Sequence, residues 1–327
     1  MSVIDVHTHM LGRGWFEMLR RHGGPHYEIR PSMDVPEAVY CDGAPFLTPQ
    51  PAHFDYARRI KDMSAAKVDL AIVSLTAPSC YWGGRDISLE AASLVNDEMA
   101  EAQRVFPDRI RWLATLPWEY PEVAVDELAR ACARGTVGVM VMANINGRSL
   151  TEPHFAPIWR AIDERALPVL IHPTSPPGTT ALDIADYGLV AAVGFMIDTT
   201  LAVSRMILDG FFDRYPKLKL IVSHAGATLP YIAGRLDFCW EKMKAARQHI
   251  DRPPSTYLRH VYYDTVCYRP EALALAIDVG GADHVLYGSD YPHNIGDMTG
   301  CLARVDALPA EQRDAIRSIN AQRIFKL

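Results

Sequence analysis

The sequence predicts an α/β fold, a (β/α)8 barrel of the TIM type with an insertion after its first strand. Two observations predict it. Short apolar segments alternate with amphipathic helical stretches along the 327 residues, and eight such segments occur, the number of strands that closes such a barrel. No Gly-x-Gly-x-x-Gly follows the first segment, which disfavours the alternative of a doubly wound open sheet that binds a dinucleotide. We expect one domain over residues 1–327, because α/β barrels commonly occupy about 250 residues or more.

The expected strands are short and apolar, as buried parallel strands are. They cover residues 3–6, 68–75, 110–116, 137–142, 168–172, 218–224, 260–264 and 284–290. Between them we expect helices near 88–106, 122–134 and 154–165. Residues 11–54 are rich in Gly, Pro, His and Arg and weakly periodic, so we expect an irregular insertion there. Long irregular segments are usually functional, and we interpret this one as a lid or small subdomain over a site.

Composition excludes several classes of function. The net charge of −6 and pI near 6.1 give no basic surface for a nucleic acid, so we expect no nucleic-acid partner. The start of the chain has no basic region followed by a long apolar stretch, and no segment approaches about 18 consecutive apolar residues. We therefore expect a cytoplasmic protein with no membrane partner. The six cysteines are scattered without a CxxC, so any metal site belongs to histidines and carboxylates.

His7 and His9 follow the first apolar segment directly. Side chains two residues apart on a strand point to the same face, so both imidazoles can converge on one metal ion. A lone His-x-His is explained equally well by chance. The pair therefore needs further ligands from distant parts of the chain.

Three more polar residues stand at the carboxyl ends of expected strands: His172 after the fifth, His224 after the sixth and Asp290 after the eighth. Taken singly, each histidine is better explained as a buried, hydrogen-bonded side chain and Asp290 as a cap or turn residue. Barrel enzymes build their active sites at this edge, however, and unrelated structural residues have no reason to share it. We predict one metal ion held by His7, His9, His172 and Asp290, with His224 free to transfer protons. Three histidines and one carboxylate leave a coordination position open, as in catalytic sites.

Several motifs now make a resemblance clear. The chain contains, in this order, IDVHTH at 4–9, VLIHP at 169–173, SHAG at 223–226 followed by GRLD at 234–237, RPPS at 252–255 and LYGSDYP at 286–292. Together these resemble the amidohydrolase superfamily. The resemblance is greatest to the branch that contains the α-amino-β-carboxymuconate-ε-semialdehyde, resorcylate and 5-carboxyvanillate decarboxylases.

The resemblance implies a distorted barrel with a single divalent ion, zinc as the usual metal and manganese in some relatives. It implies a metal-dependent, non-oxidative decarboxylase of a small aromatic or unsaturated carboxylic acid. Arg235 matches an arginine that reaches into the neighbouring subunit to hold a substrate carboxylate, which implies a homodimer. A bidentate guanidinium suits that task, although an arginine paired locally on a helix surface is the alternative.

Two departures from the family pattern concern the substrate. A second carboxylate-binding arginine ahead of the second strand has no counterpart here, since the nearest region, 44–47, reads Ala-Pro-Phe-Leu. The muconate semialdehyde is therefore not an expected substrate. The aromatic position after the LYGSDYP motif is His293, which alters the pocket wall or adds a second titrating group, so we assign it to substrate binding.

Two rival functions remain open. The same site could catalyse hydrolysis of a lactone, ester or amide, or hydration of a double bond. Asp290 or His224 would then relay the proton. The end of the fourth expected strand, 141–144, has no lysine to bridge two metals, so one ion is expected in either case. A catalytically inactive barrel that serves as a binding partner is disfavoured, because buried histidines and a carboxylate would cost stability without their metal.

Overall fold

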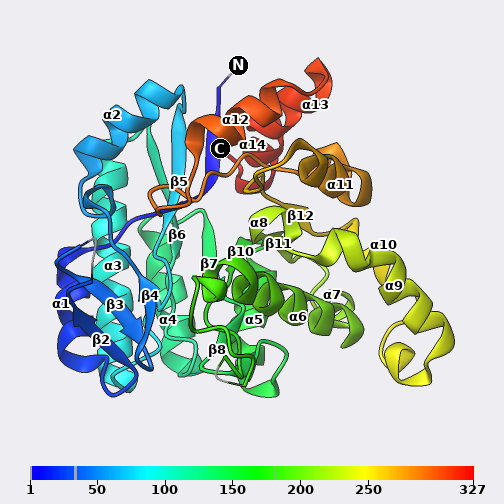
Figure 1. The fold of residues 1–327 in the computed structure, drawn as a ribbon, viewed down its shortest axis with the longest axis horizontal. Coiled ribbons are helices and arrows are strands. Elements are labelled where there is room, and N and C mark those ends of the chain that lie inside the picture. The colour runs from blue at the N-terminus through cyan, green and yellow to red at the C-terminus, as the bar shows by residue number, and fades with distance from the viewer. Residues whose placement is uncertain (1, 33–34, 180) are drawn as a thin grey trace.

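The parallel sheet forms the centre of the molecule. The computed structural model describes residues 2–32, 35–179 and 181–327. Seven strands pair in the order in which they occur in the chain, and every pair is parallel (Figure 1). They are β1 (Ile4–His9), β5 (Leu70–Ser74), β6 (Ile110–Ala114), β7 (Gly138–Met142), β10 (Pro168–His172), β11 (Lys219–Val222) and β12 (Tyr262–Tyr263). Val73, Trp112, Val141 and Ile171 on these strands are fully buried, so the core is continuous along the sheet.

The predicted eighth strand, 284–290, is wrong as a regular strand but right in position. Val285 makes a single parallel bridge to Tyr263 of β12, and Tyr291, directly after the segment, makes one to Thr8 of β1. The segment therefore lies between the last and first strands and closes a distorted barrel. Asp290, at the end of the segment, has a left-handed backbone with φ 59°. Gly288 also packs so tightly that a Cβ there would lie 2.9 Å from His7 Cβ.

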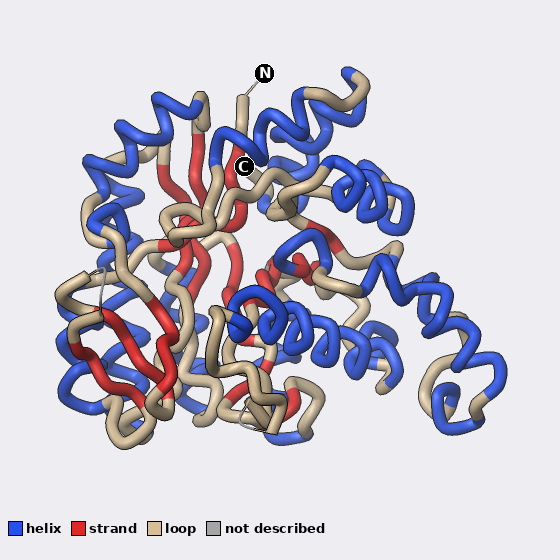
Figure 2. Tube along the Cα trace, viewed as in Figure 1, coloured by secondary structure: helices blue, strands red, loops and turns tan. Residues whose placement is uncertain are grey.

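Helices surround the strands, as the sequence predicts (Figure 2). The predicted helices at 88–106, 122–134 and 154–165 correspond to α3, α4 and α5, the last preceded by a 3-10 turn at Pro153–Phe155. The α-helices described outside the insertion are α2 (Tyr56–Ala66), α3 (Arg85–Val105), α4 (Pro121–Ala133), α5 (Ala156–Glu164), α6 (Phe195–Leu208), α7 (Phe211–Arg214), the short turn α8 (Ser223–Gly226), α9 (Leu229–Lys242), α10 (Pro254–Leu258), α11 (Pro270–Gly280), α12 (Met298–Asp306), α13 (Ala310–Asp314) and α14 (Asn320–Phe325).

Residues 11–54 are not irregular. They form α1 (Arg13–His22) and a three-stranded antiparallel sheet of β2 (Tyr27–Arg30), β3 (Ala38–Cys41) and β4 (Ala44–Leu47), which lies beside α1 in Figure 1. Asp42 and Gly43 join β3 to β4, and both have positive φ, 49° and 83°. Asp-Gly is a strong two-residue hairpin signal, so this turn was readable from the sequence. A short hairpin of β8 (Asn144–Ile145) and β9 (Arg148–Ser149) also follows β7.

One helical stretch, Val190–Leu208, is long and apolar enough to cross a membrane by length and composition. It joins a π-helical turn at 190–194 to α6. Half of this stretch is buried inside the structure, as in a core helix that packs against a barrel. Its inner residues include Phe195 and Met196, which face the cavity described below.

Candidate metal centre and active site

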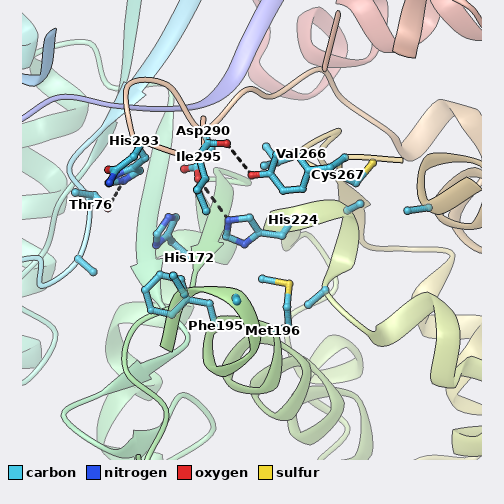
Figure 3. A pocket seen from close by; sticks show the side chains of 18 of the residues that line it. Thr76, His172, Phe195, Met196, His224, Val266, Cys267, Asp290, His293 and Ile295 are labelled. Atoms are coloured by element: carbon cyan, nitrogen blue, oxygen red, sulfur yellow. Dashed lines mark hydrogen bonds and ion pairs between the residues drawn. The ribbon is translucent and has the colours of Figure 1, made fainter. Parts of the chain in front are cut away.

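The predicted residues meet at the carboxyl edge of the barrel. His7 and His9 come from β1, and His172 is the last residue of β10. The ring centroids of these three histidines lie 4.8 to 5.2 Å apart. His224 follows β11, and Asp290 follows the segment that closes the barrel. Figure 3 shows Asp290 facing the rings of His172 and His224 across the site.

The spacing of the donor atoms suits a metal ion. Asp290 Oδ1 lies 3.2 Å from His9 Nε2 and 3.3 Å from His7 Nε2. Two ligands bound tetrahedrally at the usual zinc–nitrogen distance would lie about 3.4 Å apart. Among the described residues, the buried Nε2 atoms of His7 and His172 have no hydrogen-bond partner. Buried polar atoms are rarely left unpaired, so these nitrogens fit a divalent metal ion as their missing partner.

The Nδ1 atom of each histidine is held by an acceptor, which leaves Nε2 free to bind the ion. His7 Nδ1 lies 2.5 Å from Asp264 Oδ2, His9 Nδ1 lies 3.2 Å from the Leu75 carbonyl, and His172 Nδ1 lies 2.8 Å from the Pro173 carbonyl. Since carbonyl oxygens only accept, His9 and His172 carry their proton on Nδ1. Such contacts fix the ring orientation and raise the basicity of the ligating nitrogen.

The donor atoms that lie within 4.8 Å of one another form two overlapping groups rather than one quartet. One group contains His7, His172, His224 and Asp290, and the other contains His9, His172, Asp290 and His293. His172 and Asp290 belong to both. All four predicted ligands are therefore present at the site but distributed over both groups, and His224 and His293 stand close enough to be alternative donors.

Asp264 is a residue that sequence reasoning missed. Besides His7, its carboxylate accepts the backbone N–H of His224 at 3.0 Å and of Ala225 at 2.8 Å. It is fully buried. Asp264 ends the seventh predicted strand, so its position at the same barrel edge was the available signal. It connects a predicted ligand with the turn that carries His224.

That turn is strained. Residues Ser223–Gly226, labelled α8 in Figure 1, include His224 at φ 58°, ψ 50° and Ala225 at φ 53°, ψ 32°. Non-glycine residues in this left-handed region cost about 1–3 kcal/mol each and cluster at functional sites. Gly226 leaves no room for a side chain, since a Cβ would lie 2.6 Å from the Tyr263 ring. The turn places His224 Nε2 3.7 Å from Asp290 Oδ2.

The electrostatics of the site favour a cation. Burial opposes ionisation of Asp290, but His293, His224 and the other nearby histidines outweigh it and hold its pKa well below the usual range. Burial likewise opposes ionisation of Asp264, but His7 lowers its pKa. Burial lowers the pKa of His9 to about 3, so His9 is neutral. Asp264 and Asp290 are thus ionised, and neutral His9 offers a lone pair on Nε2, a combination that suits a positive ion.

A cavity of about 460 Å³ opens above the donor atoms (Figure 3). His172, His224, Asp290 and His293 form its polar end. His293 is part of the cavity wall, and its Nε2 lies 3.1 Å from Thr76 Oγ1. The volume is within the usual range of a small-molecule site.

Arg235 is not brought to this site by its own chain. It lies on α9, is exposed to solvent, and is not among the described residues that line the cavity. Tyr231, one helical turn before it, does line the cavity mouth. The predicted contact with a substrate carboxylate would therefore have to come from a second copy of the chain.

Known proteins resemble this chain over almost its whole length. A 2-amino-3-carboxymuconate-6-semialdehyde decarboxylase of Dictyostelium discoideum is 28% identical over 90% of this chain and 83% of the relative. A gamma-resorcylate decarboxylase of Rhizobium sp. is 30% identical over 82% of this chain and 86% of the relative. The solved structure of 5-carboxyvanillate decarboxylase from Novosphingobium aromaticivorans, with manganese and 4-hydroxy-3-methoxy-5-nitrobenzoic acid, superposes with a TM-score of 0.84 at 26% identity, covering 100% of this chain and 96% of that one.

The predicted resemblance is thereby confirmed, and with it the barrel fold and a metal-dependent carboxy-lyase activity. The amidohydrolase family model matches residues 4–327. Its relatives are decarboxylases, and one of them holds a metal ion. The chain belongs to the amidohydrolase family.

Proposed function

We propose that this chain is a non-oxidative decarboxylase of a small aromatic carboxylic acid, dependent on one divalent ion held by His7, His9, His172 and Asp290. One observation carries the proposal. Three buried imidazoles are fixed through Nδ1, and the Nε2 atoms of His7 and His9 converge on Asp290 at the base of a small-molecule cavity. Two of the similar proteins are decarboxylases of aromatic acids, which supports an aromatic acid as the substrate.

The chain's own residues supply the proton chemistry. When the carbon–carbon bond breaks and carbon dioxide leaves, its electron pair stays on the ring carbon, and a new C–H bond must form there. A bound divalent ion supplies a Lewis acid that stabilises this negative charge. His224 lines the cavity and would donate the proton from its imidazolium form. Asp290 Oδ2, 3.7 Å from His224 Nε2, would hold the charged ring in place.

The identity of the metal is part of the proposal. Three nitrogens and one carboxylate oxygen suit zinc, the metal that the family resemblance implies, while manganese prefers oxygen-rich sites. The manganese found in a similar decarboxylase keeps manganese as the alternative. Supplementing growth medium with either metal and measuring both the bound ion and the activity separates the two.

We also propose a homodimer in which Arg235 of one chain serves the site of the other. Arg235 shares α9 with two exposed aromatic side chains, Tyr231 at 83% and Phe238 at 61% exposure. Large exposed aromatic residues around a basic one are typical of a protein interface. A guanidinium arriving from a partner would meet the cavity beside Tyr231.

Residues 11–54 are proposed as the lid of the site. Phe46, Leu47 and Thr48, at the end of the small sheet, form part of the cavity wall. Movement of this segment would open the cavity to substrate and close it against water.

A cytoplasmic location remains our proposal and agrees with the six free cysteines.

The test is a substrate panel. Metal-loaded protein is incubated with hydroxybenzoates and carboxyvanillate-type acids and, separately, with lactones and esters, while mass spectrometry records carbon dioxide and new acids. We expect carbon dioxide from at least one aromatic acid and no product from the lactones. Acid formed from a lactone, with no carbon dioxide from any acid, would replace the decarboxylase with the hydrolase.

A further inference from the structure

We infer that the substrate carries one carboxylate, the one that is lost, and that the rest of the molecule is uncharged and largely apolar. This inference rests on the proposed decarboxylase function and narrows its substrate class. It follows from the distribution of charge around the cavity.

The cavity wall contains no cation apart from histidines. None of the described residues that line it is a lysine or an arginine, and its one carboxylate is Asp290. The histidines and Asp290 gather at the end where the metal ligands lie. A second anion inside the cavity, away from the metal ligands, would lose its hydration with no lysine or arginine of the described lining to replace it.

The remainder of the wall is apolar. Phe46 and Leu47 enter from β4, Phe195 and Met196 from α6, and Leu275 and Ile295 stand toward the mouth. Figure 3 shows Phe195 and Met196 on the side of His172 and His224 opposite Asp290. The remaining polar lining groups, such as Thr48 and Asn294, are neutral and suit a hydroxyl group rather than a charge.

A carboxylate pressed against this wall would lose water without gaining a counter-ion, which disfavours binding strongly. A methyl group at the same place is stabilised by burial against the apolar wall. Since one methylene group in an apolar pocket changes kcat/KM by about 10-fold or more, we expect methyl to be preferred over carboxylate by at least about 100-fold. Arg235 of a second copy is the cation that the proposed dimer would add.

The experiment compares matched substrates. For 2-hydroxybenzoate, ring positions 4, 5 and 6 each carry hydrogen, methyl or carboxylate in turn, and carbon dioxide release gives kcat/KM for the metal-loaded protein. We expect the methyl compound to match or exceed the parent at one position or more, and every dicarboxylate to fall at least about 100-fold below its methyl counterpart. A dicarboxylate used as well as its methyl counterpart overturns the inference while the decarboxylase stands. No carbon dioxide from any compound overturns both.

Two variants test the wall itself. Phe46→Arg, with Phe46→Leu as its size control, should raise kcat/KM for a dicarboxylate at one ring position at least about 10-fold and lower it for the methyl compound. Phe46 is half-buried, so the guanidinium can reach solvent if the fold resists it. No gain for any dicarboxylate in Phe46→Arg, or an equal gain in Phe46→Leu, would show that the missing cation is not what excludes a second carboxylate, contrary to the inference.

Discussion

His7 Nδ1 lies 2.5 Å from Asp264 Oδ2, and the same carboxylate accepts the backbone N–H of His224. One buried acid therefore fixes a proposed metal ligand and also holds the strained turn that presents the proposed proton donor. The metal and the proton chemistry are coupled through this group.

Replacement of Asp264 should weaken metal binding without removing a ligand. We expect Asp264→Asn to lower the affinity for zinc about 10- to 100-fold, the usual cost of losing such a supporting acid. Competition with a chromogenic chelator measures the affinity, and circular dichroism checks the fold. Asp278→Asn, at an exposed site on α11, is the matched control. Equal affinity in both variants would remove the orienting role of Asp264.

Metal binding should release a proton. Burial disfavours the charged form of His7, but Asp264 and Asp290 outweigh burial and raise its pKa to about 10 in the metal-free protein. A ligating imidazole must be neutral, so below this pH the ion displaces the proton, and affinity should rise as pH increases toward 10. Calorimetry in two buffers with different ionisation enthalpies counts the proton at pH 7.5. An identical heat in both buffers would contradict this charge state.

The same raised pKa links stability to pH. A group whose pKa is higher in the folded state stabilises the fold below its usual value, 6.5, and that contribution is lost as pH rises toward the folded value, about 10. We expect the free energy of unfolding of metal-free protein to fall between these pH values, with a smaller fall in Asp264→Asn. Urea titrations at three pH values measure it, and parallel curves for the two proteins would count against the His7–Asp264 pair.

His224 and Asp290 should fail in different ways. His224→Ala should keep its metal and lose turnover about 100- to 10,000-fold, the usual contribution of a general acid. Asp290→Ala should lose metal retention, because Asp290 faces His7, His9 and His224 at once. Elemental analysis of both variants together with their kcat separates the two roles. Unchanged turnover in His224→Ala would exclude it as the proton donor.

Arg235 can be tested by mixing chains. If it acts across a dimer, neither Arg235→Ala nor the metal-ligand variant His172→Ala is active alone, but mixed dimers contain one complete site. We expect activity to return on mixing after dissociation and reassociation. Sedimentation confirms that mixed dimers form. Mixed dimers without recovered activity would show that Arg235 does not act in trans.

The sequence predicted the positions of the site residues well, for a physical reason. His7, His9, His172 and Asp290 each follow an apolar segment, and the parallel arrangement brings the ends of all such segments to one edge. Asp264 escaped notice because its partner His7 lies 257 positions away, and no local pattern marks that pairing. A regular eighth strand is predicted because its apolar run resembles that of a paired strand, whereas the structure has only single bridges at Val285 and Tyr291.

The most direct test of the account is a metal titration of activity. Metal-depleted protein is titrated with zinc, and separately with manganese, while carbon dioxide release is followed from the best aromatic acid in the panel. We predict no turnover without metal and a linear rise that ends at one ion per chain. Full activity in metal-depleted protein, or a rise that ends at two ions per chain, would contradict the single-ion decarboxylase.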